Sequence, residues 1–398
     1  MPRLLLWSDS VCASTGFGRV ARTICNALSE DWEIVQVGLN HPGRLVEHDR
    51  IKIHAAPSDD PTGFLIAKEL YMTQDFDLLL VIQDLHITSA WASALSSMRS
   101  SRELRSKSRI PTIYHFPVDG PMLDDVGFNK FADYNVSCTQ WGVDILQPLL
   151  PDQKIDVIPH AVDTSVYKAL PEKERVGLRR DIYGIDPKDE TLAILSLGVN
   201  TDRKDHFTAL CAVKELNREQ IQGKIYFHTK AVAHGMDLYC QSRSAEVSPL
   251  EYRIADSTLL GCSDEALNKL YNASDCLLFT SRREGFGIPM IEAMAAGVPV
   301  LAPDYGPFRE VLAGGDFGYL HTPVGKVWVR GDSRGYGWQS GGDVVARHLQ
   351  FLSSAKKEAW DGPAEKIEVA RKYVEQTYSL EAVTPLWREY IKEALDGS

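Results

Sequence analysis

The segment SRREGFGIPMIEAMAAGVPVLAP sets two carboxylates, Glu284 and Glu292, around a pair of glycines. Gly285 and Gly287 let backbone N–H groups approach a ligand closely, and Pro289 suits the first turn of a helix, where its missing N–H is not needed. The start of that helix offers N–H donors and a partial positive charge to an anion. Because carboxylates repel phosphate but accept hydrogen bonds from hydroxyl groups, the pattern favours a phosphate flanked by two hydroxyl-bearing groups, as in a nucleotide sugar. The alternative is a capped helix with two surface acids.

Two adjacent cations follow one predicted strand, and a histidine lies at the end of another. Arg203 and Lys204 lie in GVNTDRKDH, between a predicted strand and a predicted helix. Cations there can neutralise the charge that develops on a leaving diphosphate, whereas the alternative is a solvated turn. His115 and Asp119 share the loop TIYHFPVDG, in which the histidine is either catalytic or structural.

A glycine-rich segment near the N-terminus resembles a dinucleotide-binding loop only in part. It contains Gly16-x-Gly18-x-x-Ala21, but eight residues separate Trp7 from Gly16, and the next predicted strand ends at Asn40 with no acid for a ribose. A nicotinamide site is therefore not expected. We interpret the segment as a flexible lip over the ligand cleft.

The bulk composition limits the class of protein. A chain of 398 residues with 44% hydrophobic and 24% charged residues predicts a globular protein of two domains. Seven scattered cysteines without a C-x-x-C pair, an apolar N-terminal run too short for a secretory signal, and no apolar stretch long enough to span a bilayer all favour a cytoplasmic location. His228 and His234 lack an obvious third ligand, so neither a metal nor a cofactor is expected.

Strands alternate with helices twice along the chain, which predicts two α/β units with mostly parallel sheets. An amphipathic helix at 18–29 has Val20, Ile24 and Leu28 on one face. Further helices are expected at 206–216, at 265–272, after Pro289 and near the C-terminus. The predicted strands are 3–8, 32–39, 77–84, 110–116, 134–139, 156–163, 192–199, 224–229, 275–281 and 298–303. Ligands of such folds bind beyond the carboxyl ends of the strands.

The net charge of −11 does not suit broad nucleic-acid binding, but one dense basic run stands out. It is SSMRSSRELRSKSR, whose cations are Arg99, Arg102, Arg105, Lys107 and Arg109. Such a run is either a solvated helix face or a contact surface for nucleic acid.

Taken together, these motifs resemble the retaining GT-B glycosyltransferases of family 4. The resemblance spans most of the chain, is best from Lys204 to Glu310, and rests on EGFGIPMIEAMAAGVPVLA, LYNASDCLLFTS, VIPHAVDT and TGFGRVA. The opening is similar to that of virus-encoded members. The resemblance implies two Rossmann-like domains whose parallel sheets face across a cleft, at residues 1–165 for the acceptor and 166–375 for the nucleotide sugar, with a helix at 376–398 returning to the first domain.

The family pattern also implies a role for each matching residue. Lys204 would bind phosphate, Glu284 the donor sugar, and Glu292 the ribose. Where many relatives carry an arginine before that lysine, this chain has Val199-Asn200, so Arg203 would substitute. The implied catalytic residues are His115, Arg203, Lys204 and Glu284. The remaining donor residues are Gly16, Gly18, Lys230, Leu260, Phe286, Gly287, Ile288 and Glu292. Arg19 and Asp119 would bind the acceptor.

The expected activity is metal-independent transfer of a hexose, with retention, from a UDP- or GDP-sugar such as UDP-glucose to a hydroxyl acceptor that is a glycan or a small molecule. Two alternatives stay open. One is a DNA glycosyltransferase that acts on a hydroxymethylated base. The other is a nucleotide-sugar-binding protein without transfer activity.

Overall fold

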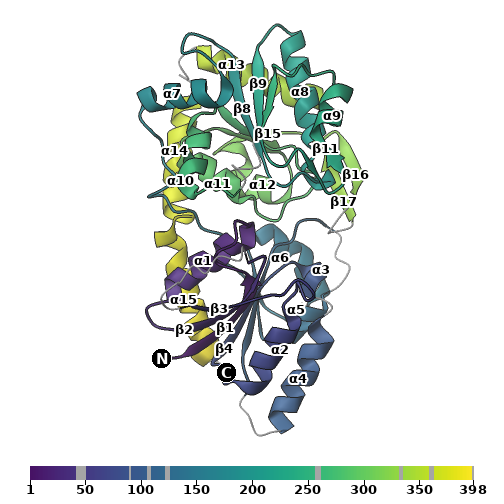
Figure 1. Ribbon diagram of the computed structural model, residues 1–398, viewed down its shortest axis with the longest axis vertical. Coiled ribbons are helices and arrows are strands. Elements are labelled where there is room, and N and C mark those ends of the chain that lie inside the picture. The colour runs from purple at the N-terminus through teal and green to yellow at the C-terminus, as the bar shows by residue number, and fades with distance from the viewer. Residues whose placement is uncertain are drawn as a thin grey trace. The chain divides into compact units, whose positions relative to one another are not determined.

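The computed structural model describes residues 1–41, 51–88, 91–104, 109–121, 126–255, 261–330, 335–357 and 363–396. The chain divides into two compact units (Figure 1). The N-terminal unit comprises Met1–Val118, Leu123–Ala161 and Leu380–Ser398, and the C-terminal unit comprises Asp119–Met122 and Val162–Ser379. The division therefore falls slightly before residue 165, and the returning segment begins slightly after residue 376. The assignment of the short segment Asp119–Met122 to the C-terminal unit was not predicted.

The N-terminal unit is built on a seven-stranded parallel sheet in the order β3-β2-β1-β4-β5-β6-β7. Its strands are β1 Arg3–Asp9, β2 Glu33–Leu39, β3 Ile51–Ala55, β4 Leu78–Ile82, β5 Thr112–Phe116, β6 Tyr134–Ser137 and β7 Ile155–Val157. Every residue of β4 is buried, as an apolar strand covered on both faces requires. The sheet carries α1 Gly16–Leu28, α2 Phe64–Thr73, α3 Leu85–Thr88, α4 Ala92–Leu104, α5 Gly127–Phe131 and α6 Gln140–Leu146.

The C-terminal helix α15, Leu380–Asp396, completes the N-terminal unit. It lies beside α1 (Figure 1), whose predicted face of Val20, Ile24 and Leu28 is buried. Trp387 is only 1% exposed, and the Arg388 guanidinium donates to the carbonyl of Ala27 at 2.7 Å. The predicted return of this helix to the first domain is confirmed.

The C-terminal unit contains a six-stranded parallel sheet in the order β12-β9-β8-β13-β14-β15. Its strands are β8 Leu192–Leu197, β9 Gly223–His228, β12 Tyr252–Ile254, β13 Cys276–Leu278, β14 Val300–Pro303 and β15 Tyr319–His321. Its helices are α7 Glu172–Tyr183, α8 His206–Arg218, α9 Leu238–Ser244, α10 Asp264–Asn272, α11 Ile288–Ala295, α12 Gly306–Val311, α13 Gly342–Lys357 and α14 Pro363–Thr377. The predicted pair of α/β units with parallel sheets is confirmed.

Two antiparallel hairpins lie outside the sheet of the C-terminal unit, and neither was predicted. One pairs β10 Val232–Ala233 with β11 Met236–Asp237. The other pairs β16 Gly325–Val329 with β17 Gly335–Gln339. The β16–β17 hairpin contacts a loop of the candidate functional site.

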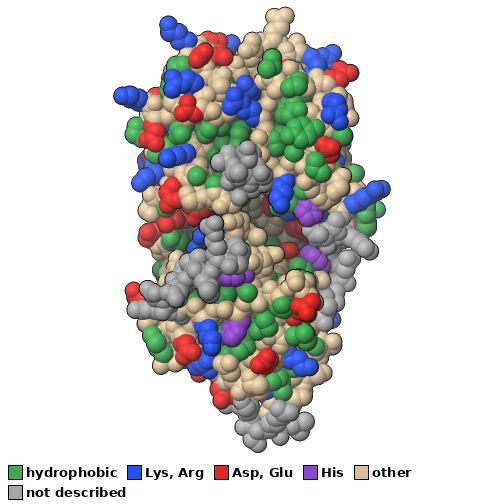
Figure 2. All heavy atoms as spheres, in the orientation of Figure 1, with side chains coloured by type: hydrophobic (Ala, Val, Ile, Leu, Met, Phe, Trp, Pro, Cys, Tyr) green, Lys and Arg blue, Asp and Glu red, His purple; other side chains and the backbone are tan. Residues whose placement is uncertain are grey.

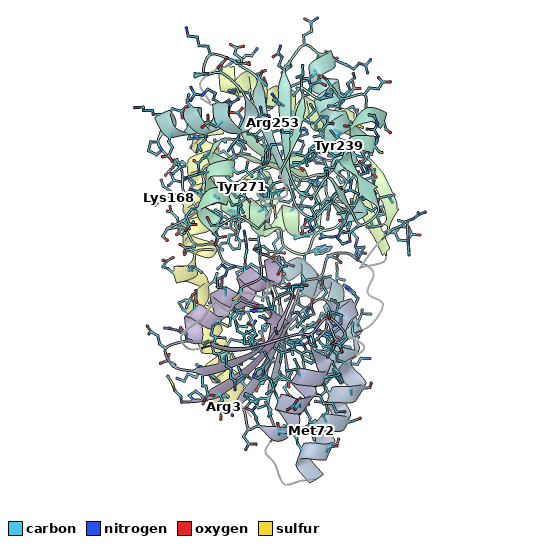
Figure 3. All side chains as sticks on the ribbon, in the orientation of Figure 1. Arg3, Met72, Lys168, Tyr239, Arg253 and Tyr271 are labelled. Atoms are coloured by element: carbon cyan, nitrogen blue, oxygen red, sulfur yellow. The ribbon has the colours of Figure 1, made fainter. Side chains whose placement is uncertain are left out.

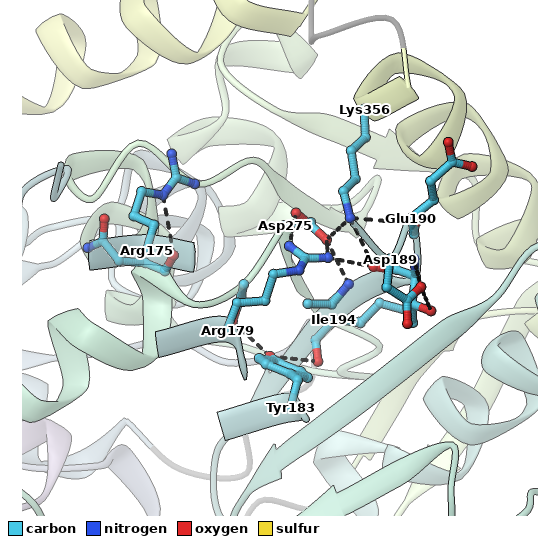
Figure 4. A network of polar contacts seen from close by, with 12 residues as sticks. Arg175, Arg179, Tyr183, Asp189, Glu190, Ile194, Asp275 and Lys356 are labelled. Atoms are coloured by element: carbon cyan, nitrogen blue, oxygen red, sulfur yellow. Dashed lines mark hydrogen bonds and ion pairs between the residues drawn. The ribbon is translucent and has the colours of Figure 1, made fainter. Parts of the chain in front are cut away.

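A buried carboxylate, Asp275, ties helices to the sheet of the C-terminal unit (Figure 4). It lies at the start of β13 and accepts hydrogen bonds from the Arg179 guanidinium of α7 at 2.5 Å and from the backbone N–H of Ala193 at 2.7 Å. Lys356 of α13 forms an ion pair with it at 3.3 Å. Since Asp275 is only 7% exposed, its charge needs these partners, and the network fixes α7 and α13 at the amino end of the sheet.

We predict that Asp275→Ala destabilises the C-terminal unit by about 3–5 kcal/mol, because Arg179 and Lys356 keep their charges without a buried partner. Urea denaturation followed by tryptophan fluorescence measures the change. The control is Glu190→Ala, which breaks an ion pair with Lys357 (3.1 Å) between two exposed side chains and is expected to cost less than about 1 kcal/mol. Equal losses in the two variants would contradict the structural role of Asp275.

Candidate functional site

The predicted helix after the glycine pair is α11, Ile288–Ala295, with Pro289 in its first turn. Gly287 precedes it with φ of +86°, a left-handed conformation that favours glycine. A Cβ at this position would also lie 2.6 Å from the Cε of Met290. Residue 287 therefore has to be glycine for the loop to enter α11 at this angle.

The loop before α11 carries Glu284 into contact with both predicted cations. The Lys204 ammonium forms an ion pair with Glu284 Oε2, and the Arg203 guanidinium lies 3.4 Å from Oε1. Arg203 also donates to the carbonyl of Arg283 at 3.0 Å. Glu284 is only 8% exposed. The structure thus brings together three of the predicted catalytic residues.

The electrostatics of this cluster keep the glutamate ionised. Burial acts to raise the pKa of Glu284, but the charges of Lys204 and Arg203 outweigh it and hold that pKa below its ordinary value. Burial and the neighbouring Arg203 lower the pKa of Lys204, while Glu284 opposes that shift. Lys204, Arg203 and Glu284 therefore form a compact group of charges from which the surrounding protein excludes much of the water.

The backbone around Lys204 is shaped to hold its long side chain. Lys204 ends a short 3-10 turn, Asp202–Lys204, beyond the carboxyl end of β8. Gly198 has φ of +130°, and a Cβ there would lie 3.0 Å from the Cε of Lys204. The next residue, Asp205, is left-handed with φ of +48° and accepts a hydrogen bond from Thr208 at 2.7 Å. These constraints fix the direction in which the ammonium points.

The β16–β17 hairpin supports the same loop from the other side. The N–H of Arg282 donates to the carbonyl of Arg203 at 2.8 Å, and the carbonyl of Arg282 accepts from the N–H of Trp338 at 2.9 Å. The Arg282 side chain forms ion pairs with Asp202 and with Asp205. The hairpin therefore clamps the segment between the cations and Glu284, a role that no sequence motif indicated.

Asp119, predicted to bind the acceptor, is paired in the structure with a buried arginine. Its carboxylate lies 3.0 Å from Arg283, which is fully buried and belongs, like Asp119, to the C-terminal unit. A Cβ on Gly120 would lie 2.1 Å from the guanidinium, so a larger residue at this position would displace Arg283 from its place beside Asp119. Sequence reasoning missed Arg283, because the pair SRRE reads as an ordinary basic doublet.

Glu292 is buried on α11, and only 1% of it is exposed. The hydroxyl of Tyr271 donates to its Oε2 at 2.6 Å. With both glutamates of the motif buried, the alternative of two surface acids is wrong. Phe286, between the two glycines, is also buried and packs its ring against Tyr378 at 5.7 Å, whereas Ile288 begins α11.

The expectation of a flexible glycine-rich lip at residues 14–19 is wrong. Gly16 and Gly18 lie in the first turn of α1, and Thr15 caps that helix by accepting from the N–H of Gly18 at 3.1 Å. A Cβ on Gly18 would lie 2.5 Å from the carbonyl oxygen of Ala13, so the glycine serves close packing. Arg19 lies in the same turn and is partly exposed.

A buried acid that sequence reasoning missed holds this cap in place. Asp9, at the end of β1, accepts from the Thr15 hydroxyl at 2.5 Å and from the Asn40 amide at 3.1 Å. Burial raises the pKa of Asp9. Asp9 ends the first strand of the sheet, whereas the dinucleotide-binding pattern places an acid at the end of the second.

His115 ends β5 and is 1% exposed, inside the N-terminal unit. Its Nδ1 lies 3.2 Å from the carbonyl of Val136, and its ring meets those of His160 and Trp387 edge to face at 5.3 and 5.1 Å. Burial lowers the pKa of His115 to about 4. The imidazole is therefore neutral at pH 7, and its place near the reacting centre stays a prediction.

The structure gives less information on the two remaining predicted donor residues, Lys230 and Leu260. Lys230 is exposed in the loop that follows β9. Leu260 lies outside the described residues, so its assignment stays a prediction.

In the described part of the basic run at 99–109, the arginines Arg99, Arg102 and Arg109 are engaged in contacts within the protein. Arg102 is 1% exposed and donates to the carbonyls of Tyr71 and Gln74. Arg99 forms an ion pair with Asp133 at 3.0 Å. Arg109 pairs with the same aspartate, and Arg105 and Lys107 lie outside the described residues. On the face drawn in Figure 2, Lys and Arg side chains are interspersed with Asp and Glu.

Within the described ranges, no group of three or more His, Cys, Asp and Glu side chains has a geometry that could hold a metal ion. None of the helices described is both long enough and apolar enough to cross a membrane. All seven cysteines are free thiols.

Comparison with solved structures gives the class of fold. Anabaena Alr3699/HepE, solved in complex with UDP and glucose, has a TM-score of 0.72 at 14% identity and covers 99% of this chain and 100% of its own. Sucrose-phosphate synthase from Thermosynechococcus elongatus has a TM-score of 0.73 at 13% identity, with 100% of both chains covered. The fold is therefore that of the GT-B glycosyltransferases.

The sequence comparisons narrow this class. Residues 180–326, which include both cations and both glutamates of the site, match the family described as Glycosyl transferases group 1. Serotype-specific mannosyltransferase WbdA of Escherichia coli is 34% identical over 30% of this chain and 14% of its own length. N-acetyl-alpha-D-glucosaminyl L-malate synthase of Bacillus anthracis is 24% identical over 59% of this chain and 60% of its own. The chain spans less than two thirds of these curated relatives, and the matches support the glycosyltransferase group 1 family.

We predict that the stability gap between wild type and Glu284→Gln narrows as pH falls below 4.5, the ordinary pKa of a glutamate. A carboxylate whose pKa is lowered by folding stabilises the protein above its unfolded pKa, and this contribution is lost as pH falls through the folded value. Urea denaturation at several pH values measures the gap. Glu69→Gln, at an exposed position of α2, serves as the control, and its stability is expected to equal that of wild type at each pH. A gap that is constant or grows on acidification would refute the ion pair.

Proposed function

We propose that the protein is a retaining glycosyltransferase that moves a hexose from a nucleotide diphosphate sugar to a hydroxyl group of an acceptor. The observation that carries the proposal is the group of Lys204, Arg203 and Glu284 at the loop that opens α11. A diphosphate at the start of that helix would meet two cations and the positive end of the helix dipole.

The proposed reaction breaks the bond between the anomeric carbon of the hexose and the diphosphate oxygen. The acceptor oxygen forms its bond to the same carbon on the same face, and the acceptor proton passes to the leaving phosphate oxygen. Negative charge grows on the diphosphate as the first bond breaks. Lys204 and Arg203 stabilise that charge, and because Glu284 already holds them in place, little reorganisation is required.

The two glutamates have separate tasks in this proposal. Glu284, at the loop, accepts hydrogen bonds from the hydroxyl groups of the hexose while it orients the cations. Glu292, one turn into α11, accepts hydrogen bonds from the ribose. The backbone of Phe286, Gly287 and Ile288 lies between them, where the diphosphate would be held.

The relatives support the donor class. HepE was solved with UDP and glucose, and WbdA is a mannosyltransferase, so we propose a UDP- or GDP-hexose as the donor. For the acceptor we propose a glycan or small molecule bound in part by the N-terminal unit. DNA is less favoured because Arg99 and Arg102 are engaged inside the protein and the net charge is −11.

We predict that Lys204→Ala lowers kcat by about 100- to 1000-fold, which corresponds to the loss of about 2.7–4 kcal/mol of transition-state stabilisation. Product mass spectrometry with UDP-glucose and GDP-mannose measures transfer, and thermal melting checks the fold. Lys204→Gln keeps a hydrogen-bond donor toward Glu284 and serves as a second variant in case Lys204→Ala does not fold. The control Lys214→Ala removes a cation of α8 that donates to the carbonyl of Glu246. Activity of Lys204→Ala within twofold of wild type would defeat the proposal, and a wild type that binds donor without transfer would identify a binding protein.

We further propose that transfer needs no metal ion, because cations and a helix N-terminus can carry the diphosphate charge. Activity is expected to persist after EDTA treatment and dialysis. Loss of activity with EDTA that is restored by Mn²⁺ or Mg²⁺ would show a metal requirement and contradict this part of the proposal.

A further inference from the structure

One contact at the site has no assigned role: the hydrogen bond from Tyr271 to Glu292. Tyr271 lies on α10 and Glu292 on α11, and their side chains are 0% and 1% exposed. The phenol donates to Oε2 at 2.6 Å. A hydrogen bond of this length to a carboxylate is charge-assisted and roughly twice as strong as a neutral one.

The surroundings explain why this bond matters for Glu292. Its neighbours on α11, Met290, Ile291, Ala293 and Met294, are all buried, so water cannot solvate the carboxylate freely. A carboxylate in such a place requires donors. The phenol donates a hydrogen bond to one of the two carboxylate oxygens from a fixed direction. It thereby fixes the orientation of the carboxylate plane.

Tyr271 is itself held from several directions. Its ring meets that of Tyr167 at 6.1 Å and 64°, and the Tyr167 hydroxyl donates to Asp264, the first residue of α10. The amide of Asn272 donates to the carbonyl of Lys168 at 3.0 Å (Tyr271 and Lys168 are labelled in Figure 3). The phenol therefore belongs to a rigid support, as a group that orients another side chain must.

We propose that Tyr271 is a positioning residue that aims the Glu292 carboxylate at the ribose hydroxyls of the donor nucleotide. The proposal rests on the proposed function, because it takes Glu292 as the ribose contact. A tyrosine that only filled the core would contribute to stability but would not affect the recognition of ribose. The two roles can be separated by binding measurements.

The test compares nucleotides with and without ribose hydroxyls. Isothermal titration calorimetry with UDP, GDP and their 2′,3′-dideoxy forms gives the preference for ribose in each variant. Wild type is expected to bind the better nucleotide about tenfold more tightly than its dideoxy form, as the loss of a hydrogen bond to a charged group implies. Tyr271→Phe is expected to reduce this preference to about twofold or less, chiefly by weakening the ribose form.

The matched control is Tyr183→Phe. Tyr183 is equally buried, and its hydroxyl bonds to the carbonyl of Ile194 at 3.1 Å and to Ser274 at 2.8 Å, in the network around Asp275. This variant is expected to lose stability while it keeps the preference for ribose. If Tyr271→Phe also keeps the full preference, the phenol is a structural group and the proposal is overturned.

A double-mutant cycle with Glu292→Gln tests whether Tyr271 acts through the glutamate. In the Glu292→Gln background, Tyr271→Phe is expected to change nucleotide affinity by less than about twofold. A loss as large as in wild type would show that Tyr271 acts by another route. Should Tyr271→Phe not fold, Tyr271→Met, which likewise offers no hydrogen-bond donor to Oε2, replaces it in the same comparison.

Failure of the inference can be told apart from failure of the proposed function. A wild type that binds neither UDP nor GDP would overturn the donor site and the inference with it. A wild type that prefers ribose but transfers no sugar would overturn only the transferase activity, and the comparison of Tyr271→Phe with Tyr183→Phe would still decide the role of the phenol.

Discussion

A buried glutamate must have its charge matched, and the way in which Glu284 is matched organises the C-terminal unit. Its partners, Lys204 and Arg203, come from the loop beyond β8. That loop keeps its shape through a glycine at 198 and a left-handed residue at 205. The segment of Glu284 in turn depends on the β16–β17 hairpin, whose Trp338 holds the backbone of Arg282. Glu284 thus serves as the internal counter-charge that allows Lys204 to be buried and holds both cations in place.

The second glutamate of the motif is satisfied in a different way. Glu292 lies on the helix and accepts a hydrogen bond from the phenol of Tyr271. The two acids therefore differ in the contacts described here, although the sequence shows them as identical residues of one motif.

Continuous apolar runs and local capping patterns made most of the fold predictable. β4, β8 and the face of α1 were foreseen from such runs. The strands of the two large sheets that were missed, β3, β12 and β15, all lie at sheet edges, where half-exposed residues leave no apolar run. At the site, two separate motifs indicated Lys204 and the glutamates Glu284 and Glu292. Their supports, which are Arg283, Tyr271 and the hairpin, were not indicated, because contacts between segments distant along the chain leave no local pattern. Gly18 shows why the predicted flexible lip was wrong, since glycine serves both close packing and loop flexibility.

The return of α15 to the N-terminal unit has a consequence for how the protein is made. The C-terminal unit draws on no residue beyond 379, so its whole sequence has been synthesised before α15 appears. The N-terminal unit begins first but lacks α15, which packs beside α1, until the last described residues have been added. The unit that starts first on the ribosome is therefore the last that can finish. A premature stop just after residue 379 would release a chain with one finished unit and one unit in which the surface covered by α15 is exposed and prone to aggregation.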